Sequence, residues 1–143
     1  MRTRSFLLIA AVFAGGFVTA RLAAPPASVH AQSERMYELR TYTTLPGRLE
    51  ALKGRFRNHT TAIFEKHGMK NIGYWTPADA PRSENTLIYI LAHDSRDAAK
   101  KSWDEFRADP EWQTVQRESE KDGKIVEKVE STFMTATDFS KLK

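Results

Sequence analysis

The side chains best suited to chemistry in this chain are one arginine, one histidine and four large aromatics, carried by three β-rich stretches. They are Arg40, Tyr42, Tyr74, Trp75, Tyr89 and His93. An arginine can hold a carboxylate through two parallel hydrogen bonds, and a histidine can exchange a proton near neutral pH. Because ligand pockets are mostly apolar with a few placed polar groups, the set predicts a small-molecule pocket. The alternative is that Arg40 pairs with Glu38 or with a carboxylate of a partner subunit, and that the aromatics form the core of an interface.

Established catalytic motifs do not occur in the sequence. It has no glycine-rich phosphate loop, no His-Glu-x-x-His, no Gly-x-Ser-x-Gly and no cysteine nucleophile. His59 and His67 lie two helical turns apart, about 12 Å, which is too far for one shared ion. We therefore predict neither a metal site nor a cofactor, and whether the protein is an enzyme stays open.

The order of the expected elements is strand, helix, strand, strand, helix, strand. The expected strands cover residues 36–44, 69–76, 86–93 and 128–137, and the helical regions cover 46–68 and 94–123. This βαββαβ order predicts a ferredoxin-like α+β domain, with one antiparallel sheet and the helices on one face. Asp94 is the expected cap of the second helical region, and Asp109-Pro110-Glu111 carries the signals of a helix restart within it.

The alternation of residues along the third strand suggests which side the helices cover. Ile88, Ile90 and Ala92 are uniformly aliphatic, so we expect them under the helices. The opposite, bare face would then carry Leu87, Tyr89, Leu91 and His93, together with Met36, Glu38, Arg40 and Tyr42 of the first strand. Such a face is too apolar to lie open to water, so the sequence predicts a homodimer in which a second copy covers it.

The first 31 residues have the pattern of an export signal. Arg2 and Arg4 precede an apolar run, and Val29-His30-Ala31 forms a cleavage site before Gln32. The apolar run is shorter than the roughly 20 residues that span a membrane. We expect a signal peptide at 1–31, a mature domain at 32–143 without stable membrane insertion, and a periplasmic or secreted location in a bacterium. An uncleaved N-terminal anchor and an earlier cut after Ala20 are the alternatives.

Charge and cysteine content restrict the partners of the mature domain. Residues 1–31 contain three arginines and no acidic residue, so their removal lowers the net charge from +4 to +1. A nucleic-acid binder needs a basic face, and we predict no nucleic-acid partner. The chain has no cysteine, so stability must come from packing and from a partner subunit rather than from disulfides.

Several short segments resemble the NIPSNAP domain family in sequence and in order. They are Tyr37-Glu38-Leu39-Arg40-Thr41-Tyr42, Pro46-Gly47, His67-Gly68, Gly73-Tyr74-Trp75-Thr76, Ala108-Asp109-Pro110-Glu111-Trp112 and Thr137-Asp138-Phe139-Ser140. The resemblance implies a dimeric α/β-barrel, in which two ferredoxin-like sheets close on each other. It covers nearly the whole chain after the leader.

The resemblance leaves three functions open. The first is an exported dimeric barrel that binds a small, partly apolar ligand. The second is an enzyme, because the dimeric α/β-barrel group includes cofactor-independent monooxygenases, haem-degrading oxygenases and lactone isomerases. The third is a protein-interaction module, because some eukaryotic members are associated with mitochondria and partner binding.

Overall fold

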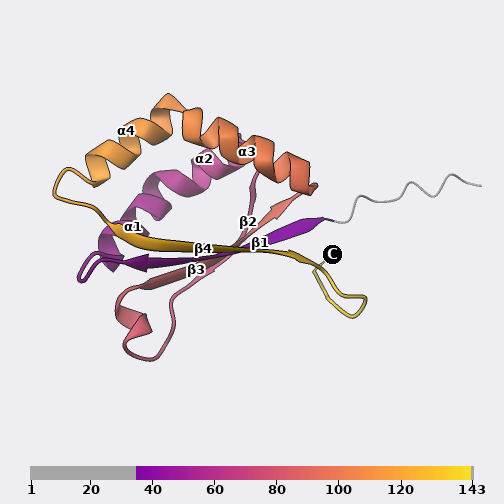
Figure 1. Ribbon diagram of the computed structural model, residues 1–143, viewed down its shortest axis with the longest axis horizontal. Coiled ribbons are helices and arrows are strands. Elements are labelled where there is room, and N and C mark those ends of the chain that lie inside the picture. The colour runs from indigo at the N-terminus through magenta and orange to yellow at the C-terminus, as the bar shows by residue number, and fades with distance from the viewer. Residues whose placement is uncertain (1–34, 143) are drawn as a thin grey trace, which may run out of the picture.

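The computed structural model describes residues 35–142, so the expected leader and its cleavage site lie outside the described residues. The elements are β1 (Met36–Thr44), α1 (Leu49–Arg55), the π-helical turn η1 (Phe56–Thr60), α2 (Thr61–Lys66), β2 (Lys70–Trp75), the short 3₁₀ turn η2 (Arg82–Glu84), β3 (Thr86–His93), α3 (Arg96–Ala108), α4 (Pro110–Ser119) and β4 (Val126–Thr135). The sheet has the order β2-β3-β1-β4, and every neighbouring pair is antiparallel. Figure 1 shows the helices on one side of this sheet, which confirms the predicted ferredoxin-like α+β fold.

The helix boundaries follow local signals, with one correction. Helices α1 and α2 continue into each other through η1, and the helix ends at Gly68, whose φ of 76° suits glycine. Asp109 caps α4 as predicted, accepting a hydrogen bond from the Glu111 backbone at 2.8 Å. The expected cap of α3 was wrong: Ser95 rather than Asp94 accepts from the Ala98 backbone at 3.0 Å. No helix among residues 35–142 is long and apolar enough to cross a membrane.

The prediction of which sheet face lies under the helices was also wrong. Glu38, Arg40 and Tyr42 do share a face with the odd-numbered residues of β3, because Arg40 lies directly opposite Tyr89. This face, however, points into the core. Tyr89 is 0% exposed, and its ring centroid lies 5.2 Å from that of Phe56 in the first helix. The larger side chains fill the depth between sheet and helices, whereas the smaller aliphatic row faces away from them.

The other face carries no helix, and we call it the open face. Its apolar residues include Tyr37, Leu39, Ile88, Ile90 and Met134. Ile88 and Ile90 are only half-buried there. The segment after β4 lies beside one end of this face, where Leu142 and Tyr37 line the same small cavity. The open face therefore remains apolar and only partly covered by the chain itself.

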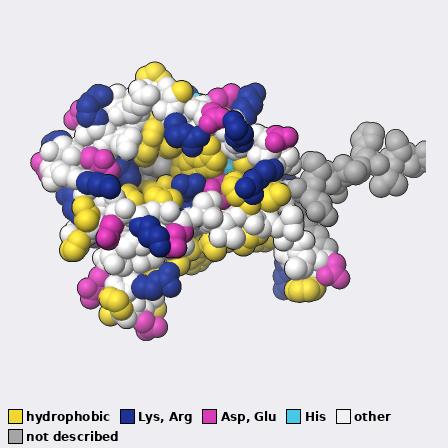
Figure 2. All heavy atoms as spheres, viewed as in Figure 1, with side chains coloured by type: hydrophobic (Ala, Val, Ile, Leu, Met, Phe, Trp, Pro, Cys, Tyr) yellow, Lys and Arg dark blue, Asp and Glu magenta, His cyan; other side chains and the backbone are white. Residues whose placement is uncertain are grey.

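The layers do not close completely at the β4 edge. Figure 2 shows a hollow between the α3–α4 layer and β4, lined largely by hydrophobic side chains. Val129, on the helix side of β4, is 42% exposed. The four-stranded sheet is thus wider than the helix layer that covers it.

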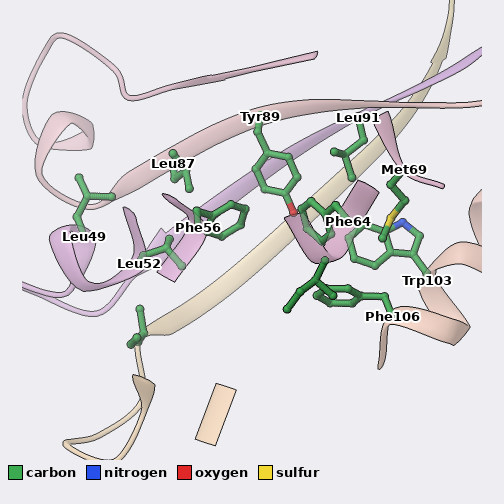
Figure 3. Packing of buried hydrophobic residues seen from close by; sticks show 12 residues of the cluster. Leu49, Leu52, Phe56, Phe64, Met69, Leu87, Tyr89, Leu91, Trp103 and Phe106 are labelled. Carbon is green, nitrogen blue, oxygen red and sulfur yellow. The ribbon is translucent and has the colours of Figure 1, made fainter. Parts of the chain in front are cut away.

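The core is a continuous cluster between sheet and helices, with Tyr89 near its centre (Figure 3). Phe56 and Phe64 approach it from the first helix, and Trp103 and Phe106 approach from α3. Phe64 contacts both Trp103 and Phe106, with ring centroids 5.4 and 5.0 Å apart. Aromatic edge and tilted contacts of this kind favour one arrangement of the two helical segments over β3.

Candidate functional site

A buried carboxylate organises the polar groups under α3. Glu38 of β1 is 1% exposed, and both its oxygens accept hydrogen bonds. Oε1 accepts from Arg40 Nη1 and from Ser131 Oγ, each at 2.7 Å. Oε2 accepts from Trp103 Nε1 at 2.7 Å and from His93 Nε2 at 3.0 Å. These residues come from β1, β3, β4 and α3, so the cluster ties the layers together.

The protonation of Glu38 follows from its partners. Burial raises the pKa of a carboxyl group, but the hydrogen bonds from His93, Ser131, Trp103 and Arg40 outweigh burial and lower the pKa of Glu38 to about 2. Glu38 is therefore ionised and can only accept. His93 must then donate from Nε2, while its buried Nδ1 has no hydrogen-bond partner among the described residues.

Arg40 lies between the carboxylate of Glu38 and the ring of Trp103. Its Cζ lies 4.2 Å from the centroid of the Trp103 ring, a cation–π geometry. Nη1 is committed to Glu38, whereas Nη2 makes only a long contact of 3.4 Å to the Tyr42 hydroxyl. The Arg40 side chain is 16% exposed. Pairing of Arg40 with Glu38 was the structural alternative raised from the sequence, and the structure contains it, but donor capacity on Nη2 is left over.

Tyr42, which contacts Arg40, lines a cavity of about 320 Å³ that opens between α4 and β4. The cavity is lined by Tyr42, Arg55, Phe56, Thr60, Phe64, Phe106, Trp112, Gln116, Glu120, Lys124, Val126, Glu127 and Val129. Its volume is at the small end of the roughly 300–1,000 Å³ range of ligand pockets. We call it the first cavity. Its inner wall is aromatic. Its charged residues are Arg55 of α1, Glu120 directly after α4, Lys124 before β4 and Glu127 of β4.

One ion pair closes the far rim of the first cavity. Arg55 Nη1 contacts Glu120 Oε1 at 3.2 Å and Ser119 Oγ at 3.3 Å. The Arg55 guanidinium also lies over the Trp112 ring, 5.3 Å from its centroid. The rim thus joins the end of α1 to the end of α4 and holds Trp112 against the opening.

Behind Tyr42, the hydroxyl of Tyr89 is buried without a hydrogen-bond partner among residues 35–142. The Tyr89 ring lies 5.4 Å from Tyr42 and stacks on Tyr74 at 5.3 Å. Burial raises the pKa of Tyr89 well above its ordinary value, so the phenol is neutral near pH 7. The Tyr74 hydroxyl is satisfied differently, because it donates to Asn71 Oδ1.

The six predicted site residues are only partly brought together. Arg40, Tyr42, Tyr74, Tyr89 and His93 lie on the helix side of the sheet, but among them only Tyr42 lines the first cavity. His93 is buried against Glu38 at the far end of the cluster. Trp75 lies opposite Ile88, on the side of the open face, and is 51% exposed.

Several residues of the site were not predicted from the sequence. Glu38 was expected only as a possible partner of Arg40, and its bonds to Trp103 and Ser131 join positions 65 and 93 residues away. Trp112 and Phe56 also line the first cavity, and neither was named as a site residue from the sequence. Within the described range, no group of three or more His, Asp or Glu side chains is arranged to hold a metal ion.

Comparisons with known proteins agree on the family. The NIPSNAP family profile matches residues 37–141. A NIPSNAP family protein of unknown function from Agrobacterium tumefaciens superposes with a TM-score of 0.67 at 25% identity, covering 80% of this chain and 98% of that one. A NIPSNAP-like domain protein from Burkholderia xenovorans gives 0.65 at 18% identity, covering 76% and 90%.

A protein outside the family shares the fold of this chain. SnoaB, a cofactor-independent oxygenase from Streptomyces nogalater, superposes with a TM-score of 0.50 at 14% identity, covering 77% of this chain and 99% of SnoaB. At that identity the likeness concerns the fold alone. No curated protein matches the chain. With the profile spanning nearly all of the described residues and the NIPSNAP structures sharing the fold, the chain belongs to the NIPSNAP family.

Proposed function

We propose that this protein binds a small, partly apolar molecule in the first cavity, and that a carboxylate or carbonyl oxygen of the ligand is held by Tyr42 and Arg40. The observation that carries the proposal is that Tyr42, whose hydroxyl contacts Arg40 Nη2 at 3.4 Å, lines an aromatic-walled cavity of about 320 Å³. In the proposed complex the Tyr42 hydroxyl donates to the ligand oxygen while it accepts from Arg40, and Arg40 Nη2 supplies its second N–H. Two donors beside aromatic walls suit a molecule with one oxygen-bearing end.

The three tryptophans of the chain allow this site to be tested directly. Trp112 lines the first cavity, Trp103 binds Glu38, and Trp75 lies outside both. Each gives one indole N–H signal in a ¹⁵N–¹H spectrum. Titration of the mature protein with aromatic and straight-chain carboxylates should move the Trp112 signal, while the Trp75 signal moves less.

Two tyrosines of β1 provide a matched pair of variants. Tyr42→Phe removes the proposed donor and should weaken binding about five- to tenfold, the value of one hydrogen bond of about 1 kcal/mol or slightly more. Tyr37→Phe, on the opposite face of the same strand, should leave affinity unchanged. If no compound moves the Trp112 signal, or if the two variants weaken binding equally, the proposed site is wrong. Oxygen uptake with a bound electron-rich aromatic would instead favour an oxygenase.

We also propose that the mature protein is a homodimer joined through the open face. The support is physical: Leu39, Ile88 and Ile90 form an apolar strip without a helix over it, and a two-fold axis would let two identical strips cover each other. Tyr89 and Leu91, which were predicted from the sequence to lie on the face covered by the second copy, are instead buried in the core. Light scattering should give about twice the mass of the mature chain. Ile88→Glu should produce a folded monomer, and a wild type that is monomeric at micromolar concentration would contradict the proposal.

We propose, finally, that the protein is exported and that residues 1–31 are removed. The support is the order of charged start, apolar run and Val29-His30-Ala31 in the sequence. Intact-mass measurement of protein recovered from the periplasm of a bacterial host should place the new N-terminus at Gln32. A recovered mass that still includes residues 1–31 would favour a retained anchor.

A further inference from the structure

A second cavity, of about 300 Å³, lies beside the first helix towards β2. It is lined by Lys53, Phe56, Arg57, Thr61, Tyr74, Trp75, Thr76 and Leu87. Phe56 also lines the first cavity. The two cavities therefore share the part of their walls that Phe56 forms.

The shared wall is built from the π-helical turn η1. Phe56 begins the turn and Thr60 ends it. Thr60 lines the first cavity, whereas Thr61, the next residue, lines the second. Residues of η1 and the residue that follows it thus line both cavities, in keeping with the frequent occurrence of π turns at functional sites.

The Phe56 ring bridges the aromatic walls of both cavities. Its centroid lies 5.8 Å from that of Tyr42, in the first cavity, and 5.7 Å from that of Tyr74, in the second. The side chain is 4% exposed, so the ring is fixed by packing. With the phenyl group removed, a ligand held at Tyr42 would have a continuous apolar path towards Leu87 and Tyr74.

We infer that Phe56 sets the maximum length of the ligand, and that the ligands of this protein are short carboxylates or carbonyl compounds whose apolar end stops against Phe56. The inference rests on the proposed function, because it assumes that the oxygen-bearing end lies at Tyr42. The second cavity is then the space from which longer molecules are excluded. Lys53 and Arg57 at its rim would let a longer dicarboxylate reach a second cation if the ring were absent.

Straight-chain monocarboxylates from acetate to dodecanoate test this by calorimetry on the mature protein. In the wild type, each added methylene should raise affinity about fourfold until the chain meets Phe56, and further methylenes should add nothing. Phe56→Ala should extend the rise by several methylenes. Phe56→Leu, which keeps more of the core filled, should extend it less.

Phe64→Ala is the matched control, because Phe64 is equally buried and lines the first cavity but not the second. It should weaken binding without lengthening the series. If the Phe56 variants level off at the same chain length as the wild type, or if Phe64→Ala extends the series equally, the inference is overturned while the proposed function stands. If the wild type binds no member of the series or of the aromatic carboxylates, both fail.

Discussion

Replacing Glu38 by glutamine should destabilise the protein strongly at neutral pH. The carboxylate has four donors around its two oxygens. In glutamine, one oxygen becomes an NH₂ group, which must face either Arg40 and Ser131 or His93 and Trp103. In both cases it meets a group that can only donate, Arg40 or Trp103. Arg40 also loses its anion. Removal of one partner from a buried ion pair costs about 3–5 kcal/mol, and we expect a loss in that range.

The same substitution should remove part of the acid sensitivity. The pKa of Glu38 falls from an ordinary value of 4.5 to about 2 on folding, which at 1.36 kcal/mol per pKa unit is about 3 kcal/mol. Because the pKa is lower in the folded protein, this stabilisation is fully present above pH 4.5 and is lost as the pH falls towards 2. The difference in stability between wild type and Glu38→Gln should therefore narrow by about 3 kcal/mol between pH 5 and pH 2.

Urea unfolding followed by circular dichroism at pH 7, 5, 4, 3 and 2.5 measures this difference directly, since the other carboxyl groups titrate in both proteins. Glu130→Gln is the control, because Glu130 pairs with Lys128 at 2.9 Å on the same sheet but is 57% exposed. It should change stability by less than about 0.5 kcal/mol. A loss below 1 kcal/mol for Glu38→Gln at pH 7, or a difference that does not depend on pH, would refute the role assigned to the cluster.

Three further substitutions follow from the contacts. Tyr89→Phe removes a buried hydroxyl that has no partner among the described residues, so thermal or urea unfolding should show no loss, or a gain of up to about 1 kcal/mol; a clear loss would indicate a bound water or another missing partner. Gly54→Ala adds a Cβ with nothing within 4 Å near the end of α1, where the helix continues into η1, and it should raise stability by about 0.5–1 kcal/mol. A lower melting temperature would mean that the added methyl disturbs the helix contacts. Asp109→Ala removes the cap on the Glu111 backbone together with the bonds to Lys66 and His67, so it should cost about 2 kcal/mol. Asp104→Ala, whose side-chain partners are exposed, should cost almost nothing, and equal losses from the two aspartates would contradict the capping role.

The order of the elements could be predicted because its signals are local. Gly68 ends one helix and Asp109 starts another through contacts with residues a few positions away. Which face of the sheet lies under the helices could not be predicted in this way. Both alternating rows of β3 are apolar, so the pattern does not show which row faces the helices. The opposite assignment places every side chain of the strand on the other face. Tyr89 packs under the helices because Phe56 and Phe64 meet it there, and such distant pairings leave no local pattern.

The position of Trp75 could have been narrowed from the strand geometry alone. Tyr74 and Trp75 are adjacent on β2, and adjacent residues of a strand point to opposite faces, so both could not be expected on one face with Arg40 and Tyr89. They line a cavity together only at the β2 edge of the sheet. Glu38 is a different case. Its bonds to Trp103 of α3 and Ser131 of β4 depend on three elements meeting, and the sequence around each residue carries no sign of the others.

The position of β1 in the sheet has a consequence for how the chain folds during synthesis. Its two neighbours are β3 and β4, so Leu39 pairs with Ile90 and Thr132, both of which are made later. The backbone hydrogen bonds between β1 and β4 can therefore form only after β4, the last strand of the domain, has been made. Contacts between such distant segments slow folding. The sheet of this domain is therefore complete only after its C-terminal strand has been made.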